Sequence, residues 1–252
     1  MSTFLSLLNH HGAELEPRRL NPDISRAIMA MSRCRTGALG HVQWGCQGCH
    51  HDDRTPLSCG HRHCPQCQHT NTMQWLARQE AKLLPTHYFM ITFTVPAELR
   101  KMAITHARCL YSLMFSVAAS VLKDFAQRKH GGDSGFTLVL HTHNRRRDIH
   151  PHLHAIVPAG FYHPRRKQWH NGNKQFLYSH RALASVWRAR LLTAIHAHPL
   201  LVLPSLLPET WVVDCRAVGR GLPALKYLSR YLYRGVLPDK DIVDISDNQV
   251  TF

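Results

Sequence analysis

The segment from Cys34 to Gln68 limits the possible folds most, because it has too few aliphatic side chains to form a core of its own. Six of the eight cysteines in the chain lie between Cys34 and Cys67, among histidines and glycines. This clustering is typical of metal sites and unlike the dispersed pattern of a disulfide framework, so it also favours a reducing compartment. The segment therefore predicts a small module that folds around metal.

Two C-x-x-C knuckles, separated by fourteen residues, come close to the spacing of a four-cysteine zinc site. Each knuckle lets two thiolates reach one tetrahedral ion, and four thiolates leave no position open for water, so we expect a structural zinc ion. The predicted zinc ligands are Cys46, Cys49, Cys64 and Cys67. Four more residues could complete a second site, replace one of these ligands or only pack: Cys34, Cys59, His61 and His63.

The chain divides into two predicted domains at Pro85, which ends a helical stretch and precedes a strong strand pattern. Residues 1–84 are expected to form a helical lead-in and a zinc-binding domain with its metal core at about 34–68. Residues 85–252 are expected to form a catalytic domain in which strands at 87–95, 136–141, 150–157 and 211–218 alternate with helices at 103–129, 181–196 and 223–234. This order predicts an α+β fold with helices packed on a mainly antiparallel sheet.

One predicted strand carries three histidines in alternation, His150, His152 and His154, and the strand before it carries His141. Successive side chains of a strand point to opposite faces, so His152 and His154 share a face about 7 Å apart and can bind one cation. His150 or His141 is a candidate third ligand. Imidazoles alone leave positions open for water and phosphate, so we expect Mg²⁺ or Mn²⁺ to complete its shell with phosphate oxygens.

The predicted helix at 223–234 carries two tyrosines four residues apart, Tyr227 and Tyr231, which therefore share one helix face. A divalent cation and a phenol are what cleavage of a phosphodiester through a covalent phosphotyrosine requires. Basic residues recur beside the tyrosines and in the loop after the histidine strand, and we expect them to hold phosphates. These predicted nucleic-acid contacts are Lys226, Arg230, Arg234, Arg165, Arg166 and Lys167.

Composition agrees with a polyanionic partner. Lys and Arg outnumber Asp and Glu by 31 to 16, and the formal net charge is +15. The N-terminus lacks a secretory apolar region, and Leu110–Leu122 would span only about 20 Å as a helix, against a membrane core of about 30 Å. We therefore expect a soluble cytoplasmic protein with no membrane contact.

Taken together, these segments resemble a known family, the rolling-circle insertion-sequence transposases of the HUH, two-tyrosine kind that carry an N-terminal transposase zinc-binding domain. The resemblance rests on the order of several segments along the chain. They are Cys34-Arg35-Thr36, Leu39-Gly40-His41, Ser58-Cys59, Arg62-His63-Cys64-Pro65-Gln66-Cys67-Gln68, Phe93-Thr94-Val95-Pro96, Leu140-His141-Thr142, His150-Pro151-His152-Leu153-His154 and Lys226-Tyr227 through Tyr231. After His141-Thr142 the family commonly has an aromatic residue and a glycine, whereas this chain has His143-Asn144.

The resemblance implies a metal-dependent endonuclease and strand transferase that acts on single-stranded DNA at transposon ends and target. Tyr227 or Tyr231 would take the 5′ phosphate, and the other tyrosine would act in the second strand transfer. Family members usually run well past residue 252, so we expect the chain to be C-terminally truncated. The oligomeric state is left open by the sequence.

Two alternatives remain at this point. In one, the chain is a zinc-dependent DNA-binding protein whose histidines and tyrosines serve only its structure. It would bind DNA whether or not Tyr227 and Tyr231 are present, and it would form no covalent adduct. In the other, the chain is a rolling-circle replication initiator that uses the same chemistry on a different DNA.

Overall fold

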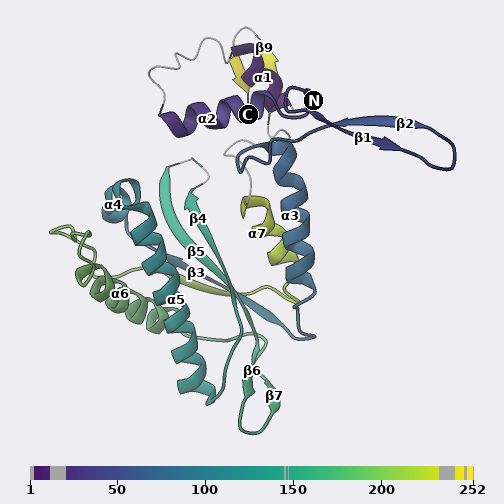
Figure 1. Cartoon of the computed structure of the whole chain (residues 1–252). Helices are drawn as coiled ribbons and strands as arrows, with labels where there is room; N and C mark the ends of the chain where they lie inside the picture. Colours follow the sequence, from purple (N-terminus) through teal and green to yellow (C-terminus); the bar gives the residue numbers. More distant parts are fainter. Residues whose placement is uncertain are drawn as a thin grey trace. The chain divides into compact units, whose positions relative to one another are not determined.

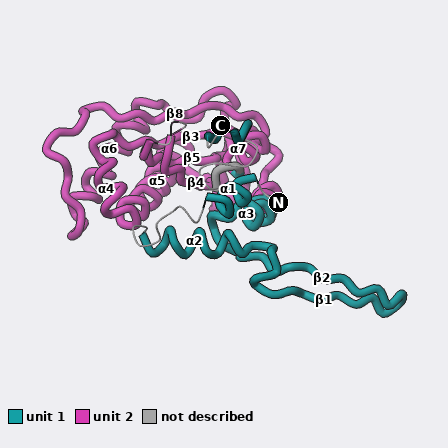
Figure 2. Tube along the Cα trace, turned by 90° about the horizontal axis from the view of Figure 1, so that it is seen from above, with its two compact units in different colours: residues 1–75, 229–252 teal, residues 76–228 magenta. Residues whose placement is uncertain are grey.

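The computed structural model describes residues 3–11, 21–144, 146, 148–232, 242–246 and 249–251, with the side chains of 230–232 left outside the description. Contacts divide the chain into two compact units, residues 1–75 with 229–252 and residues 76–228, which Figure 2 colours separately. Each unit is described by itself below. The predicted domain boundary between residues 84 and 85 stays a prediction.

The first unit contains short helices, a two-stranded ribbon and a small second ribbon (Figure 1). Its elements are α1 (Thr3–His11), α2 (Pro22–Ser32), β1 (His41–Gly45), β2 (Asp52–Pro56), the first part of α3 (Pro65–Glu80), β9 (Asp244–Ser246) and β10 (Gln249–Thr251). The start of α2 follows from its sequence, because the Asn21 side chain accepts a hydrogen bond from the Asp23 amide at 2.8 Å and Pro22 occupies the first turn.

The core of the first unit is small and is built around sulfur. Its buried residues are Leu5, Ala27, Met31, Cys34, Cys64 and Cys67. Three of these six side chains are cysteines, so a large share of the buried surface comes from thiols. This arrangement agrees with the expectation that the module does not fold on aliphatic packing alone.

The second unit is a four-stranded antiparallel sheet with helices, and it confirms the predicted α+β class. Its strand order is β4-β5-β3-β8. The two central strands are β5, which carries His152 and His154, and β3, which corresponds to the strand expected at 87–95. The elements are the end of α3, β3 (Tyr88–Thr94), η1 (Ala97–Leu99), α4 (Arg100–Thr105), α5 (Ala107–His130), β4 (Thr137–His143), β5 (Ile149–Pro158), β6 (Gly160–His163), β7 (Gln168–Asn171), α6 (His180–His196), β8 (Val213–Ala217) and most of α7 (Leu222–Leu232).

Alternation along β5 separates the core from the histidines. Leu153, Ala155 and Val157 are at most 1% exposed and belong to the core cluster that also contains residues of α5 and α6. His152 and His154 therefore point to the opposite face of the sheet. Trp187 of α6 is fully buried in the same core, and its indole N–H donates to the carbonyl of Thr94 at the end of β3 at 2.8 Å.

The long helix expected over 103–129 is divided in the structure. α4 ends before His106, whose φ and ψ of −132° and 40° are not helical, and α5 then runs to Gly131, which closes it in the left-handed conformation with φ of +63°. α5 has the length and composition of a helix that could cross a membrane. Its residues Leu110, Met114 and Val121 are fully buried in the core of the unit, which accounts for that composition.

The core of the second unit predicts a clear contrast between two single substitutions. Leu191 of α6 has no exposed surface, so Leu191→Ala should lower the free energy of unfolding by about 2–5 kcal/mol through lost burial and a cavity. Val202 is 86% exposed, so Val202→Ala should change the free energy of unfolding by less than about 0.5 kcal/mol. Urea denaturation of both variants, followed by circular dichroism, checks the difference.

Candidate active site

Three histidines from two neighbouring strands come together on one face of the sheet. His152 and His154 lie on β5, and His141 of β4 is the register partner of His152. The ring centroids are 4.5 to 5.1 Å apart, and one ring nitrogen of each lies within 4.8 Å of the others. Such a spacing lets the three imidazoles converge on one cation.

The neighbouring groups orient two of the imidazoles. Nδ1 of His152 lies 2.7 Å from the backbone carbonyl of His150, which can only accept, so this nitrogen carries the proton and leaves the Nε2 lone pair for a metal. Nδ1 of His154 lies 3.0 Å from Oγ1 of Thr92, its register partner on β3. The sequence reasoning missed Thr92. Its place on the strand that pairs with β5 becomes evident only once the register is known.

Burial keeps these histidines neutral. Desolvation, with a further contribution from the neighbouring imidazoles, lowers the pKa of His141 to about 3 and that of His154 to about 4, and it also lowers the pKa of His152. At neutral pH all three rings are therefore unprotonated and can act as ligands. Three neutral imidazoles close together, two of them buried and His152 half-buried, are a candidate cation site.

The two candidates for a third ligand are thus placed differently. His141 is 8% exposed and joins the group, while His150 is half-buried and contributes its carbonyl to His152 rather than its ring to the cluster. The ring of His150 lies 5.4 Å from that of His152. Among the described residues, the group of three close donors contains His141 and not His150.

Tyr227 lies beside the histidines. It is half-buried on α7, and its ring centroid is 6.5 Å from that of His154, with the two rings almost perpendicular. The adjacent Leu225 and Leu228 are buried, so the apolar face of the helix fixes the side from which Tyr227 projects. The structure therefore brings one of the two predicted tyrosines to the histidine cluster.

The remaining predicted contacts lie in part outside the described residues. α7 continues through Tyr231, but the side chains of Arg230 and Tyr231 are not described, and Arg234 is not described at all. Lys226 is exposed on α7. The exposed loop between β6 and β7 carries the three other basic residues, Arg165, Arg166 and Lys167.

Four thiols meet in the first unit. The sulfur of Cys34 lies 3.6 Å from those of Cys64 and Cys67, and Cys59 completes the group at 3.7 Å from Cys67. All four sulfurs lie within 4.8 Å of one another, as a tetrahedral thiolate site requires. The backbone amide of Cys59 donates to the sulfur of Cys34 at 3.5 Å.

The chemistry of this donor set fits zinc. Burial raises the pKa of the Cys64 thiol to about 11 and raises that of Cys59 as well, so the thiols would not ionise together without a cation. A zinc ion supplies that charge and accepts four thiolates. The zinc-binding module expected from the cysteine pattern therefore has a complete set of four ligands.

This set differs from the predicted one in two members. Cys64 and Cys67 are present as expected, but Cys46 and Cys49 lie exposed in the turn between β1 and β2 and do not join it. Their places are taken by Cys34, which follows α2, and by Cys59. The two C-x-x-C motifs have the same spacing, so the sequence cannot distinguish them. Only the fold determines which motif lies beside Cys34 and Cys59.

His61 and His63, the two histidines that were candidate zinc ligands, stay outside the thiol group. Their rings lie 5.5 Å apart, and the backbone amide of His63 donates to Nδ1 of His61. The carbonyl of His61 accepts a hydrogen bond from the buried Gln68 side chain at 2.7 Å. His61 thus supports the loop that precedes Cys64.

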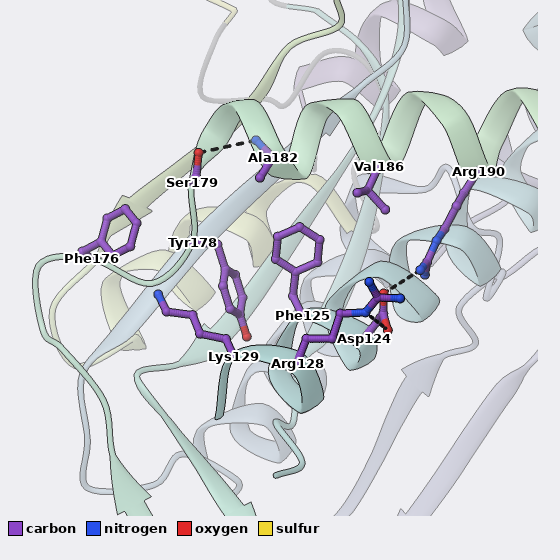
Figure 3. A pocket seen from close by; sticks show the side chains of 10 residues that line it. All are labelled: Asp124, Phe125, Arg128, Lys129, Phe176, Tyr178, Ser179, Ala182, Val186 and Arg190. Atoms are coloured by element: carbon purple, nitrogen blue, oxygen red, sulfur yellow. Dashed lines mark hydrogen bonds and ion pairs between the residues drawn. The ribbon is translucent and has the colours of Figure 1, made fainter. Parts of the chain in front are cut away.

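A cavity of about 460 Å³ lies in the second unit between α5 and α6 (Figure 3). Lys129 reaches into it, with Nζ 4.4 Å from the centroid of the Phe176 ring, and desolvation lowers the pKa of this lysine. α5 and α6 pack against the face of the sheet that carries Leu153, opposite to the histidines. The cavity is therefore separate from the histidine site.

Two family models match the chain. The transposase zinc-binding domain matches residues 7–95, and a putative transposase model matches residues 135–252. The chain is 33% identical to putative transposase y4qJ of Sinorhizobium fredii, over 90% of this chain and 63% of that protein. It is also 33% identical to the transposase for insertion sequence element IS801 of Pseudomonas savastanoi pv. phaseolicola, over 53% of this chain and 32% of that protein.

Solved structures show a partial likeness. The metal-bound conjugative relaxase TrwC in complex with oriT DNA is 17% identical, with a TM-score of 0.36, over 44% of this chain and 43% of that chain. TrwC complexed with a 27-mer DNA is also 17% identical, with a TM-score of 0.39, over 49% of each chain.

The four-cysteine group lies inside the match to the transposase zinc-binding domain, and His141, His152, His154 and Tyr227 lie inside the match to the putative transposase model. Together the two models cover most of the chain, and both describe transposases, in the order that the motifs indicated. The chain spans about two thirds and about one third, respectively, of the lengths of the two curated relatives it matches.

The thiol group predicts a dependence of the first unit on metal. Cys64 is fully buried in the group, so Cys64→Ser should abolish zinc binding there and lower the thermal stability of the unit. Cys109 of α5 is outside the group, so Cys109→Ser is the matched control and should leave both properties unchanged. Thermal unfolding with and without a chelator checks this. Equal sensitivity of Cys64→Ser and wild type to the chelator would contradict it.

Proposed function

We propose that this chain nicks and rejoins single-stranded DNA at the ends of an insertion sequence and at its target, through a 5′-phosphotyrosine intermediate. The observation that carries the proposal is the group of three neutral histidines, two buried and one half-buried, with the Tyr227 ring 6.5 Å from that of His154. The transposase relatives support the substrate class, and the net charge of +15 suits a polyanion.

The chemistry is a pair of transesterifications. The Tyr227 oxygen attacks the phosphorus in line, the bond to the 3′ oxygen breaks, and that oxygen leaves with a proton as a free 3′ hydroxyl while the 5′ phosphate stays on the tyrosine. A 3′ hydroxyl then attacks the phosphotyrosine and regenerates the phenol. Tyr231 would take the second strand. The number of phosphate ester bonds is conserved, so no ATP is needed.

Different residues would bind the metal, orient its ligands and bind the DNA. His141, His152 and His154 would hold Mg²⁺ or Mn²⁺, which when bound polarises the phosphoryl oxygen that develops charge. The carbonyl of His150 and the hydroxyl of Thr92 keep the imidazoles oriented. The basic residues would bind the DNA backbone, namely Lys226, Arg230, Arg234, Arg165, Arg166 and Lys167. The site of action would be the bacterial cytoplasm, at the nucleoid.

Covalent capture tests the tyrosines. The purified chain is incubated with Mg²⁺ or Mn²⁺ and end-labelled single-stranded oligonucleotides from the element's ends, and adducts are resolved after denaturation. Wild type should form an adduct that EDTA prevents. Tyr227→Phe together with Tyr231→Phe should abolish it, while Tyr162→Phe in the β6–β7 hairpin should retain it. DNA binding by wild type with no adduct would instead favour the DNA-binding alternative.

The histidine geometry predicts an order among ligand variants. His141→Ala should lower the cleavage rate by on the order of 100-fold or more and weaken Mn²⁺ binding, because it removes a member of the group. His150→Ala should lower the rate much less, because the contact with His152 uses a backbone carbonyl that the substitution keeps. Cleavage rates at several Mn²⁺ concentrations check this. A larger loss of cleavage rate in His150→Ala than in His141→Ala would indicate that His150, and not His141, is the third metal ligand.

A further inference from the structure

The cavity between α5 and α6 combines aromatic rings with charged side chains. Its volume of about 460 Å³ falls in the range of small-molecule sites, roughly 300–1,000 Å³. The rings of Phe125 and Tyr178 meet edge to face with centroids 5.3 Å apart, and Tyr178 is only 3% exposed. Phe176 is 52% exposed, so its ring is open to a ligand at the edge of the cavity (Figure 3).

Lys129 places an ammonium group against these rings. Its Nζ lies 4.4 Å from the centroid of the Phe176 ring and 5.5 Å from that of Tyr178, and it donates a hydrogen bond to the carbonyl of Leu177. An ammonium group has three N–H donors, so this bond leaves donors for an anion. An anionic group bound here would therefore lie beside an aromatic surface.

The charged side chains of the cavity leave a surplus of two positive charges. Asp124 is the one carboxylate among the described residues that line the cavity, and it accepts hydrogen bonds from Arg128 at 2.9 Å and from Arg190 at 2.6 Å. One aspartate balances one of the two arginines, and Lys129 adds another positive charge. α6 begins in the same lining at Ser179, so the positive end of its helix dipole also lies at the cavity.

A nucleotide matches both parts of this lining. A planar base can stack on an exposed aromatic ring while its phosphate binds to the cationic side chains beside the ring, and proteins that bind single strands combine these two contacts. An aliphatic anion would leave the Phe176 ring unused, and an uncharged aromatic ligand would leave the surplus charge unused. Bases inside a duplex are covered by their neighbours, so the nucleotide must be unpaired.

We propose that the cavity binds one unpaired nucleotide, with its base against Phe176 and its phosphate at Lys129 and Arg128. The nucleotide is either one unit of a single strand or a free nucleotide, since both present the same base and phosphate. The proposal goes beyond strand cleavage, because the cavity lies on the face of the sheet opposite to the histidines. None of the described residues that line it has a role in the proposed cleavage.

Photochemical crosslinking locates the nucleotide. The full chain is mixed in EDTA, which prevents cleavage, with 5-iododeoxyuridine monophosphate or with a short single-stranded oligonucleotide that contains one 5-iododeoxyuridine. Irradiation couples this base to aromatic side chains in contact with it, and mass spectrometry of the digested protein identifies them. We expect crosslinks at Phe176 or Tyr178. Crosslinks with the oligonucleotide alone would identify a strand as the source, and crosslinks with the monophosphate alone would identify a free nucleotide.

Two variants test the base contact and the phosphate contact separately. Phe176→Ala should weaken the binding of deoxyuridine monophosphate, measured by titration calorimetry in EDTA, by on the order of 10-fold because a stacking contact is lost. Lys129→Gln keeps every ring, and it should lower the crosslinking yield by on the order of 10-fold because a charged donor to the phosphate is lost. The matched controls are Tyr162→Ala, an exposed ring on β6, and Lys123→Gln, an exposed lysine of α5 outside the lining. Both should behave as wild type.

Three results would overturn the proposal. Crosslinks confined to other parts of the chain would mean that the base does not enter the cavity. Unchanged binding in Phe176→Ala would mean that its ring takes no part. Inorganic phosphate that binds wild type as tightly as deoxyuridine monophosphate would mean that the cavity holds an anion without a base. Circular dichroism establishes that the variants are folded, as expected for exposed side chains.

The two proposals fail separately. Crosslinking is measured without metal and needs no cleavage, so the absence of a tyrosine adduct in wild type, together with crosslinks at Phe176 or Tyr178, would count against strand cleavage alone. An adduct without such crosslinks would count against the cavity alone.

Discussion

The antiparallel register of β5 between β4 and β3 determines where the chemical groups of the second unit lie. It places His152 opposite His141 on one side and Thr94 on the other, and it places His154 opposite Thr92. A shift of one residue would turn both histidines into the core and Leu153 out of it. Because Leu153 is fully buried, such a shift would expose a core leucine and bury imidazoles without ligands, so packing and chemistry fix the same register.

Both candidate metal-binding groups are largely buried, and in each of them desolvation disfavours the charged forms of the side chains. Desolvation keeps the imidazoles of His141 and His154 neutral, and it raises the pKa of Cys64 and Cys59. Neutral imidazoles are already in the form that binds a cation, whereas the thiols must first lose protons. Metal binding is therefore coupled to proton release in the first unit, where it also contributes to folding.

The sequence predicted the strands well because alternation and aromatic content are local signals. It placed His152 and His154 on one face for the same reason. It did not decide between His141 and His150, because that choice depends on the pairing of β4 with β5 and on the register shift between His141 and His143. The cysteine partners were likewise not decided by spacing: Cys34 meets Cys67 through the packing of α2 against the start of α3, a contact between residues far apart in the chain.

The thiol group and the histidine group differ in how many coordination positions they would leave open on a bound metal ion. This difference suits them to different roles. Four thiols fill a tetrahedron, so an ion held by Cys34, Cys59, Cys64 and Cys67 has no position for a substrate. Three imidazoles leave positions where phosphate oxygens can bind, which suits catalysis. Nitrogen donors also bind transition metals more strongly than they bind Mg²⁺, so an all-histidine group favours Mn²⁺ unless Mg²⁺ is in large excess. Two factors favour Mg²⁺ instead, namely its abundance and the oxygen ligands of the DNA phosphate. The bound metal therefore depends on the balance between these factors and the preference of the imidazoles for Mn²⁺.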